Sequence, residues 1–207
     1  MNGLPDPIFR AFEKGTGAYR YRGAPCVKNP IDMAIIANLL WEAKPRTIIE
    51  VGSGAGGSAL WMRDLMRAYG VACEVHSIDR RKVQTSGPMD CVFFYGGDGR
   101  DLGATFSNEF MVDQPHPLFM IEDADHLPET TAAVLEFFDQ WSRPGEYIVI
   151  EDGAADLYDP YKGYKGGPAL AIKAFIAEQA GAYEVDRRYC DMFGMTCNPD
   201  GYIRRAK

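Results

Sequence analysis

The sequence lacks the features of several specialised protein classes. No apolar run in its 207 residues approaches the ~20 residues of a membrane helix. The first residues carry no basic segment followed by an apolar one, so we expect no signal peptide. The five cysteines are irregularly spaced and form no Cys-x-x-Cys pair, which argues against zinc and redox sites. We therefore expect no membrane partner, and reduced thiols in a cytoplasmic protein.

Positive charge is also scarce. The chain has 22 Lys and Arg residues against 29 Asp and Glu residues, a formal net charge of -7. Its only basic clusters, Arg80–Lys82 and Arg204–Arg205, are too small for a surface that binds a polyanion. We therefore expect no nucleic-acid partner. The remaining composition, 46% hydrophobic and 25% charged, is typical of a soluble globular protein of about one domain.

Apolar strand-like segments alternate with amphipathic segments along most of the chain. The predicted strands are 47–51, 74–78, 91–95, 118–121 and 147–150, and the predicted helices are 31–43, 58–69, 128–141 and 169–180. Such alternation indicates a parallel sheet covered by helices on both faces. Residues 183–189 and 202–205 resemble two strands with no long helix between them. The sequence thus predicts a doubly wound, mostly parallel α/β sheet with a C-terminal antiparallel hairpin.

The domain organisation follows from the same pattern. Residues 1–30 are rich in Gly, Pro, Arg and Tyr and are predicted to form an irregular N-terminal arm. Residues 31–207 are predicted to form a single domain. Acidic residues stand at or just after the end of each strand of this domain, at Glu50, Asp79, Asp98, Asp123 and Glu151–Asp152. Because ligands of open α/β sheets bind outside the carboxyl ends of the strands, we expect these acids to line one crevice.

A glycine-rich turn follows the first strand and opens a helix. Gly52, Gly54 and Gly57 fit the pattern G-x-G-x-x-G, in which glycines allow a tight turn and close approach of a ligand. Dinucleotides and S-adenosylmethionine both use such turns, and a plain helix-start turn is a further alternative. The carboxylate of Glu50 would repel a pyrophosphate but attract a sulfonium and an ammonium group. The charge therefore favours S-adenosylmethionine over a nicotinamide or flavin dinucleotide.

The donor site predicted from this turn extends to neighbouring strand ends. Asp79 can accept hydrogen bonds from both ribose hydroxyls, and Asp98 can contact the adenine edge. The full set of predicted donor-binding residues is Glu50, Gly52, Ser53, Gly54, Gly57, Ser58, Asp79, Asp98 and Asp123.

A second group of acids is predicted to hold a metal ion. Asp123 follows the fourth strand, and Glu151 and Asp152 follow the fifth. Three carboxylates so close together would repel one another unless a cation lay among them. Oxygen ligands suit magnesium, calcium or manganese. Asp125 is an alternative to Asp123, although an acid there can also serve as a helix cap.

His126 is the candidate general base. It lies three residues after Asp123, and an imidazole has a pKa suited to accepting a proton from an acceptor hydroxyl. The other two histidines are predicted to be structural, because His76 falls inside a strand and His116 stands between two prolines. An isolated histidine is more often structural, so the assignment of His126 as a general base depends on the acidic residues around it.

A long segment follows the proposed metal ligands. Residues 153–168 form a predicted loop of about sixteen residues, a length that usually indicates a functional or disordered segment. Three tyrosines could form an aromatic wall for an acceptor, with two lysines at its rim: Tyr158, Tyr161, Tyr164, Lys162 and Lys165. A solvated linker is the alternative.

The combination of these motifs resembles the cephalosporin hydroxylase family from about residue 21 to 205. The motifs are Gly23-Ala-Pro…Lys28-Asn-Pro, Ile48-Ile-Glu-Val-Gly…Gly56-Gly-Ser-Ala-Leu-Trp61, Glu122-Asp-Ala-Asp-His126, Val149-Ile-Glu-Asp-Gly153, Gly166-Gly-Pro168 and Asp191-Met-Phe-Gly…Asn198-Pro-Asp-Gly-Tyr202. The resemblance implies a class I methyltransferase, Rossmann-like fold with similarity to the macrolide-sugar O-methyltransferases. It also implies S-adenosylmethionine at the turn, Mg²⁺ at Asp123, Glu151 and Asp152, a base at His126, and a homo-oligomer.

The predicted function is therefore Mg²⁺-dependent O-methylation of a small hydroxylated acceptor, such as a sugar or another natural product, with S-adenosylmethionine as donor. Two alternatives remain at this stage. One is a hydroxylase or hydroxylase component, although the sequence shows no two-histidine, one-carboxylate iron triad. The other is a binding module that retains the cofactor pocket without turnover.

Overall fold

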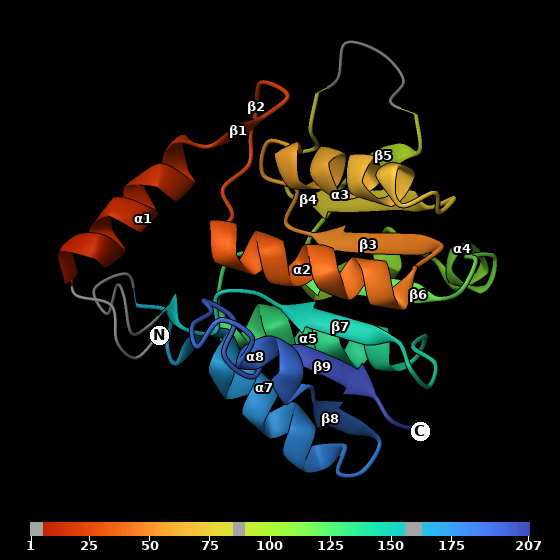
Figure 1. Ribbon diagram of the computed structural model, residues 1–207. Helices are drawn as coiled ribbons and strands as arrows, with labels where there is room; N and C mark the ends of the chain where they lie inside the picture. Colours follow the sequence, from red (N-terminus) through yellow and green to blue (C-terminus); the bar gives the residue numbers. More distant parts are fainter. Residues whose placement is uncertain (1–5, 85–89, 156–162) are drawn as a thin grey trace.

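A computed structural model describes residues 6–84, 90–155 and 163–207 (Figure 1). Its main sheet has seven strands in the order β5-β4-β3-β6-β7-β9-β8. Their bounds are β3 Thr47–Val51, β4 Glu74–Asp79, β5 Val92–Gly96, β6 Leu118–Glu122, β7 Tyr147–Ile150, β8 Tyr183–Val185 and β9 Tyr202–Arg205. Strands β3 to β7 are parallel, whereas β9 runs antiparallel to both β7 and β8. The predicted parallel sheet with an antiparallel C-terminal strand pair is confirmed.

Helices cover both faces of this sheet (Figure 1). One layer consists of α2 (Pro30–Ala43), α3 (Gly57–Ala68) and α8 (Arg187–Cys190). The other consists of η1 (Gly99–Ala104), α4 (Asn108–Val112), α5 (Pro128–Asp139) and α7 (Gly167–Glu178). Because side chains alternate along a strand, Ile48 packs in the first layer and Ile49 in the second. Both residues are fully buried, so the strands read as continuous apolar runs.

The parallel strands place the predicted acidic residues at one edge of the sheet. The chain leaves β3 toward β4 on one side, and β6 lies on the other side of β3. This point is the topological switch of the sheet, where open α/β proteins bind their ligands. The carboxyl ends of β3, β4, β6 and β7 all open onto this edge. The acids do not line a single pocket at this edge, since Asp79 lines one pocket and Glu151 and Asp152 line another.

The first thirty residues differ from the predicted irregular arm. They contain the helix α1 (Asp6–Ala18) and a short antiparallel pair, β1 (Arg20–Tyr21) and β2 (Ala24–Pro25). The Tyr21 hydroxyl donates to Asp64 of α3 at 3.0 Å, which ties this pair to the domain. The apolar residues of α1 recur at helical spacing, but Gly15 and Gly17 obscure that pattern in the sequence.

Two further local expectations were wrong or incomplete. The segment predicted as a strand over 183–189 ends at Val185, because Asp186 caps the short helix α8 by accepting from the Arg188 amide at 3.1 Å. Helices η1 and α4 were not predicted, since each is too short to show a periodic apolar face. Their N-caps are Asp98 and Ser107.

The described part of the chain contains no helix long and apolar enough to cross a membrane. All five cysteines are free, and four of them are buried. His76 is buried and stacks on Phe93 with ring centroids 5.0 Å apart, as expected of a core histidine. His116 lies outside the strands, and its Nδ1 contacts Glu146 Oε1 at 2.5 Å.

Candidate active site

The glycine-rich turn closes tightly over the end of β6. Gly52 has a φ of 104°, and a Cβ atom there would lie 1.9 Å from the Asp123 carbonyl oxygen. Gly57 has a different role, because its missing side chain makes room for the Pro25 carbonyl, 2.3 Å from an ideal Cβ. The turn therefore fixes Asp123 on one side and the N-terminal segment on the other.

A cavity of about 140 Å³ lies between the turn and the ends of the neighbouring strands. Its lining includes Gly52, Asp79, Gly97, Gly99, Ala124 and Asp125. Asp79 Oδ2 accepts from the Gly54 amide at 3.0 Å, and Oδ1 accepts from the Arg81 amide at 2.9 Å. Asp79 thus holds the glycine turn in place and presents its carboxylate to the cavity. Of the predicted donor-binding residues, Gly52 and Asp79 line this cavity.

Glu50 lies beneath this cavity, in a network of buried hydroxyl groups. Its carboxylate is fully buried and accepts hydrogen bonds from Ser58 and, at 2.5 Å, from Ser77. Ser53 joins the network through a 2.6 Å contact between its Oγ and that of Ser77. Burial raises the pKa of Glu50, whereas the positive charge of Lys28 lowers it. Three predicted donor residues, Glu50, Ser53 and Ser58, therefore support the turn from below.

Asp98 is occupied by arginines. Its Oδ2 accepts from Arg100 at 3.0 Å and from Arg80 at 3.3 Å. Hydrogen bonds from Arg100 hold the pKa of this carboxyl below its ordinary value. Arg80 also reaches Asp125 at 3.0 Å. Arg80 therefore links Asp98 to Asp125 beside the donor cavity, and Asp125 is directed toward this arginine.

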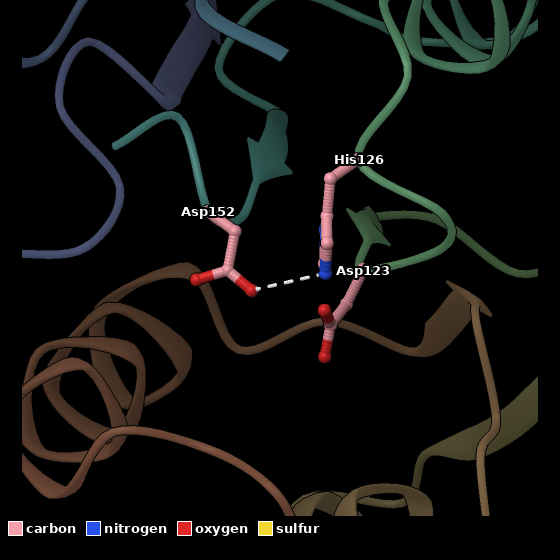
Figure 2. A group of neighbouring side chains, drawn as sticks. All are labelled: Asp123, His126 and Asp152. Atoms are coloured by element: carbon pink, nitrogen blue, oxygen red, sulfur yellow. Dashed lines mark ion pairs between the residues drawn. The ribbon is translucent and has the colours of Figure 1, made fainter. Parts of the chain in front are cut away.

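Asp123, His126 and Asp152 converge at the next strand ends (Figure 2). One potential ligand atom from each lies within 4.8 Å of the other two. His126 Nε2 is 3.6 Å from Asp152 Oδ2. His126 and Asp152 both have a left-handed backbone, with φ of 57° and 53°. Such a conformation is uncommon for residues other than glycine and is concentrated at functional sites.

This cluster fits a hard divalent cation. Asp123 and Asp152 supply carboxylate oxygens, and Mg²⁺ usually takes one or two carboxylates and keeps several positions for water or substrate. Burial, followed by the negative charge of Asp123, raises the pKa of Asp152 to about 7. Two carboxylates held this close repel each other, and a cation between them would relieve that repulsion.

Glu151, the third predicted metal ligand, has a different partner. Its Oε1 lies 2.6 Å from the Lys28 ammonium, which also contacts Asp123 Oδ2 at 2.9 Å. Lys28 is only 3% exposed. Burial lowers the pKa of Lys28, but Asp123, Glu151 and Glu50 together raise it well above its ordinary value. A protein cation therefore already lies among the acids.

A second pocket, of about 220 Å³, opens onto His126 and Asp152. Tyr164 also lines it, with its ring edge-on to the His126 imidazole at a centroid distance of 5.4 Å. Of the predicted aromatic wall, Tyr158, Tyr161 and Lys162 lie outside the described residues. Lys165 forms an exposed ion pair with Glu129 at 3.3 Å.

One short segment contributes residues to both pockets. Ala124 and Asp125 line the cavity at the glycine turn, whereas His126 lines the second pocket. The loop after β6 is therefore a wall common to both. The His126 imidazole therefore borders the second pocket, one residue along the chain from Asp125 in the first.

Sequence reasoning did not single out Lys28 or Asn198 as site residues. Asn198 is buried, and its Oδ1 accepts from the Asp152 amide at 2.9 Å, which holds the left-handed residue in place. Both residues come from segments with no periodic pattern, far along the chain from the strand ends. Both residues do fall in motifs that carry the family resemblance, Lys28-Asn-Pro and Asn198-Pro-Asp-Gly-Tyr202, and that is the signal that could have found them.

Known proteins resemble this chain in sequence. The sequence model of the rhamnosyl O-methyltransferase/CmcI family matches residues 14–206. A rhamnosyl O-methyltransferase of Mycobacterium tuberculosis H37Rv is 27% identical over 189 residues, covering 89% of this chain and 77% of that protein. The Mycobacterium leprae protein of the same name is 28% identical over 188 residues, covering 89% and 82%.

Solved structures agree with the sequence relatives. CmcI with Mg-SAM superposes with a TM-score of 0.73 at 27% identity, covering 100% of this chain and 87% of the other. MycE with Mg and SAH has a TM-score of 0.55 at 16% identity, covering 83% and 48%, and therefore supports the fold alone. The fold is that of the class I methyltransferases, and the chain belongs to the rhamnosyl O-methyltransferase/CmcI family.

Proposed function

We propose that this protein is an S-adenosylmethionine-dependent, Mg²⁺-dependent O-methyltransferase that acts on a hydroxyl group of a sugar or sugar-bearing natural product. The observation that carries the proposal is the cluster of Asp123, His126 and Asp152 at the end of a loop that lines two pockets. Methyl transfer needs a donor and an acceptor held in direct contact, and the loop after β6 lines the pockets that we assign to the two molecules.

The donor is assigned to the cavity at the glycine turn. Asp79 offers a carboxylate there, and Gly52, Gly97 and Gly99 line the same cavity. CmcI, which has the same fold and is 27% identical, is known with Mg-SAM. Glu50 contributes through the hydroxyl network that shapes the turn, and its buried negative charge favours a cationic ligand.

The reaction we infer is an in-line displacement. S-adenosylmethionine supplies the methyl group on its sulfonium, and Mg²⁺ supplies a positive charge that lowers the pKa of the acceptor hydroxyl. His126 Nε2 accepts the hydroxyl proton as the oxygen forms its bond to the methyl carbon and the carbon–sulfur bond breaks. Asp152, 3.6 Å away, then stabilises the imidazolium ion. Tyr164 packs edge-on against the same ring and restrains its orientation.

The acceptor class follows from the relatives. The curated proteins of this family that match over 89% of the chain are rhamnosyl O-methyltransferases. The second pocket, with carboxylates and an imidazole in its lining, suits a polyhydroxylated ring. A rhamnoside is therefore the first acceptor to test. The cytoplasmic location and the homo-oligomer stay predictions.

The two alternative functions have less support. An iron hydroxylase of the common type needs two histidines and a carboxylate, and the cluster among the described residues holds a single histidine. A binding module without turnover would have no need for His126 in a left-handed conformation beside two acids.

Mass spectrometry with a panel of glycosides tests the proposal. Incubation with S-adenosylmethionine and Mg²⁺ should add one methyl group to a sugar hydroxyl and release S-adenosylhomocysteine in equal amount. A chelator should stop the reaction, and added Mg²⁺ should restore it. Tight donor binding with no methylated product from any glycoside would favour the binding module instead.

A further inference from the structure

The segment 196–201, which precedes β9, holds the carboxyl end of β7. Three alternate amides donate to this segment: Ile150 to the Gly201 carbonyl at 2.8 Å, Asp152 to Asn198 Oδ1 at 2.9 Å, and Ala154 to the Cys197 carbonyl at 3.0 Å. The intervening Glu151 amide donates instead to the Glu122 carbonyl of β6 at 2.9 Å. The backbone of Asp152 is therefore held by the segment 196–201, whereas that of Glu151 is held by β6.

This segment is anchored to Asp32, which lies in the first turn of α2. Asp32 is only 1% exposed. Its Oδ1 accepts from the Thr196 hydroxyl and, at 3.2 Å, from the Tyr202 hydroxyl, and its Oδ2 accepts from the Cys197 amide at 2.9 Å. Hydrogen bonds to a buried carboxylate are stronger than those between neutral groups, because they stabilise its charge. Asp32 therefore fixes the start of the segment 196–201.

A short path of hydrogen bonds joins Asp32 to Asp152. The Thr196 hydroxyl, which donates to Asp32, accepts from the Asn198 amide at 3.0 Å. Asn198 Oδ1 in turn accepts from the Asp152 amide, and its Nδ2 donates to the Tyr202 hydroxyl at 3.3 Å. Asp152 has a φ of 53°, a conformation that a residue other than glycine keeps only when its surroundings hold it there. The path from Asp32 supplies this support.

We propose that Asp32 is a positioning residue for the metal site and does not contact the metal ion. It acts through Thr196 and Asn198, which hold the backbone of Asp152 so that its carboxylate faces the other two members of the cluster. This assignment rests on the proposed function, in which Asp152 is a metal ligand. Residues that only orient a metal ligand are worth about 10- to 100-fold in metal affinity.

Calorimetry with Mg²⁺ on protein saturated with S-adenosylhomocysteine tests the assignment. Asp32→Ala should weaken Mg²⁺ binding by about 10- to 100-fold. Asp32→Asn keeps one acceptor oxygen and the shape of the side chain, so its loss should be smaller. Both variants should bind S-adenosylhomocysteine like the parent, which also shows that they fold, because Asp32 does not line the cavity at the glycine turn. A parental Mg²⁺ affinity in Asp32→Ala would overturn the assignment.

A further variant separates position from charge. The negative charge of Asp32 would attract a cation even without the hydrogen-bonded path. Thr196→Val keeps this charge and nearly the same side-chain volume, but it removes the hydroxyl group between Asp32 and Asn198. We expect Mg²⁺ binding about tenfold weaker and unchanged binding of S-adenosylhomocysteine. If Thr196→Val binds Mg²⁺ like the parent while Asp32→Asn binds it weakly, Asp32 acts through its charge and the positioning assignment is wrong.

Asp186→Asn is the matched control. Asp186 is a buried carboxylate that likewise accepts from a tyrosine hydroxyl and a backbone amide, those of Tyr147 at 2.9 Å and Arg188 at 3.1 Å. It does not line the pocket at His126, so this variant should bind Mg²⁺ like the parent. An equal loss in Asp186→Asn would show a general effect of buried carboxylates and overturn the assignment.

Failure of the proposed function gives a different result. If the parent protein binds S-adenosylhomocysteine but no Mg²⁺, the metal site of the proposed function is wrong, and Asp32 has no metal ligand to position. If the parent binds both and only the Asp32 and Thr196 variants lose Mg²⁺, the metal site and its positioning residue are both supported.

Discussion

The Lys28 ammonium lies 2.6 Å from Glu151 Oε1, inside the protein and beside the predicted metal ligands. This pair changes the electrostatics expected from the sequence, which showed only acids at these strand ends. A buried cation offsets part of their repulsion and links the segment before α2 to the end of β7. The site can therefore form before any metal ion binds.

Replacement of Lys28 should strongly destabilise the protein. Lys28→Met leaves Glu151 buried without its cation, and the loss of one partner of a buried pair costs about 3–5 kcal/mol. Urea unfolding at neutral pH measures the change. Lys165→Met is the matched control, because its pair with Glu129 is exposed and is worth less than about 1 kcal/mol. Similar losses in the two variants would show that the Lys28 pair contributes no more than an exposed one.

Asp152 should be needed for metal binding but not for donor binding. We expect Asp152→Asn to weaken Mg²⁺ binding by ~100-fold or more, since even residues that only orient a metal ligand are worth 10–100-fold. Calorimetry with Mg²⁺ and with S-adenosylhomocysteine separates the two effects. Asp125→Asn is the control, because Asp125 is directed toward Arg80. If Asp125→Asn loses the metal and Asp152→Asn keeps it, the ligand assignment is wrong.

Gly52 should tolerate no side chain. Alanine there would place its Cβ 1.9 Å from the Asp123 carbonyl at a φ of 104°, so we expect a loss of more than about 3 kcal/mol in unfolding free energy. At Gly54 the φ is 51° and no atom lies within 4 Å, so Gly54→Ala should cost only about 1–2 kcal/mol. Thermal unfolding of both variants gives the comparison, and equal costs would argue against close packing at Gly52.

Glu122 should make stability depend on pH. This residue is 1% exposed, and burial raises its pKa to about 7. Because the folded state holds the proton more tightly than the unfolded state, stability falls as pH rises from about 4.5 to 7. Glu122→Gln removes this ionisation, so the variant should gain up to about 3 kcal/mol relative to the parent between pH 5 and pH 8.

Urea unfolding of metal-free protein at both pH values measures the Glu122 effect. Glu129→Gln, at an exposed position near the start of α5, is the control. The unfolding free energy of Glu129→Gln should differ from that of the parent by a nearly constant amount above pH 5. A constant difference for Glu122→Gln as well would mean that the buried carboxyl group ionises as it does in the unfolded chain.

Much of the fold could be predicted from the sequence, because the signals were local. Strands β3, β7 and β9 have the predicted bounds. In β3 and β7 a short, mostly apolar run ends at a turn or at charged residues. The locations of the glycine turn and of the acids at the strand ends could also be predicted, because the carboxyl ends of parallel strands lie at the same edge of the sheet.

The rest depends on contacts between distant segments. No pattern near Lys28 indicates that its ammonium reaches Glu151, 123 residues away in the sequence. Likewise, Glu50 was expected to contact the ligand, but it is buried and accepts hydrogen bonds from the hydroxyl groups of two serines. The helical arm α1 was missed because two glycines near its end suggested a loop.

The single-turnover rate of His126→Asn tests the central claim most directly. Asparagine tolerates the left-handed backbone at this position but supplies no base, so the fold is preserved while proton transfer is lost. With labelled S-adenosylmethionine, Mg²⁺ and an accepted glycoside, we predict a rate about 10²- to 10⁴-fold below that of the parent, with unchanged affinity for S-adenosylhomocysteine. A rate within twofold of the parent would contradict the account.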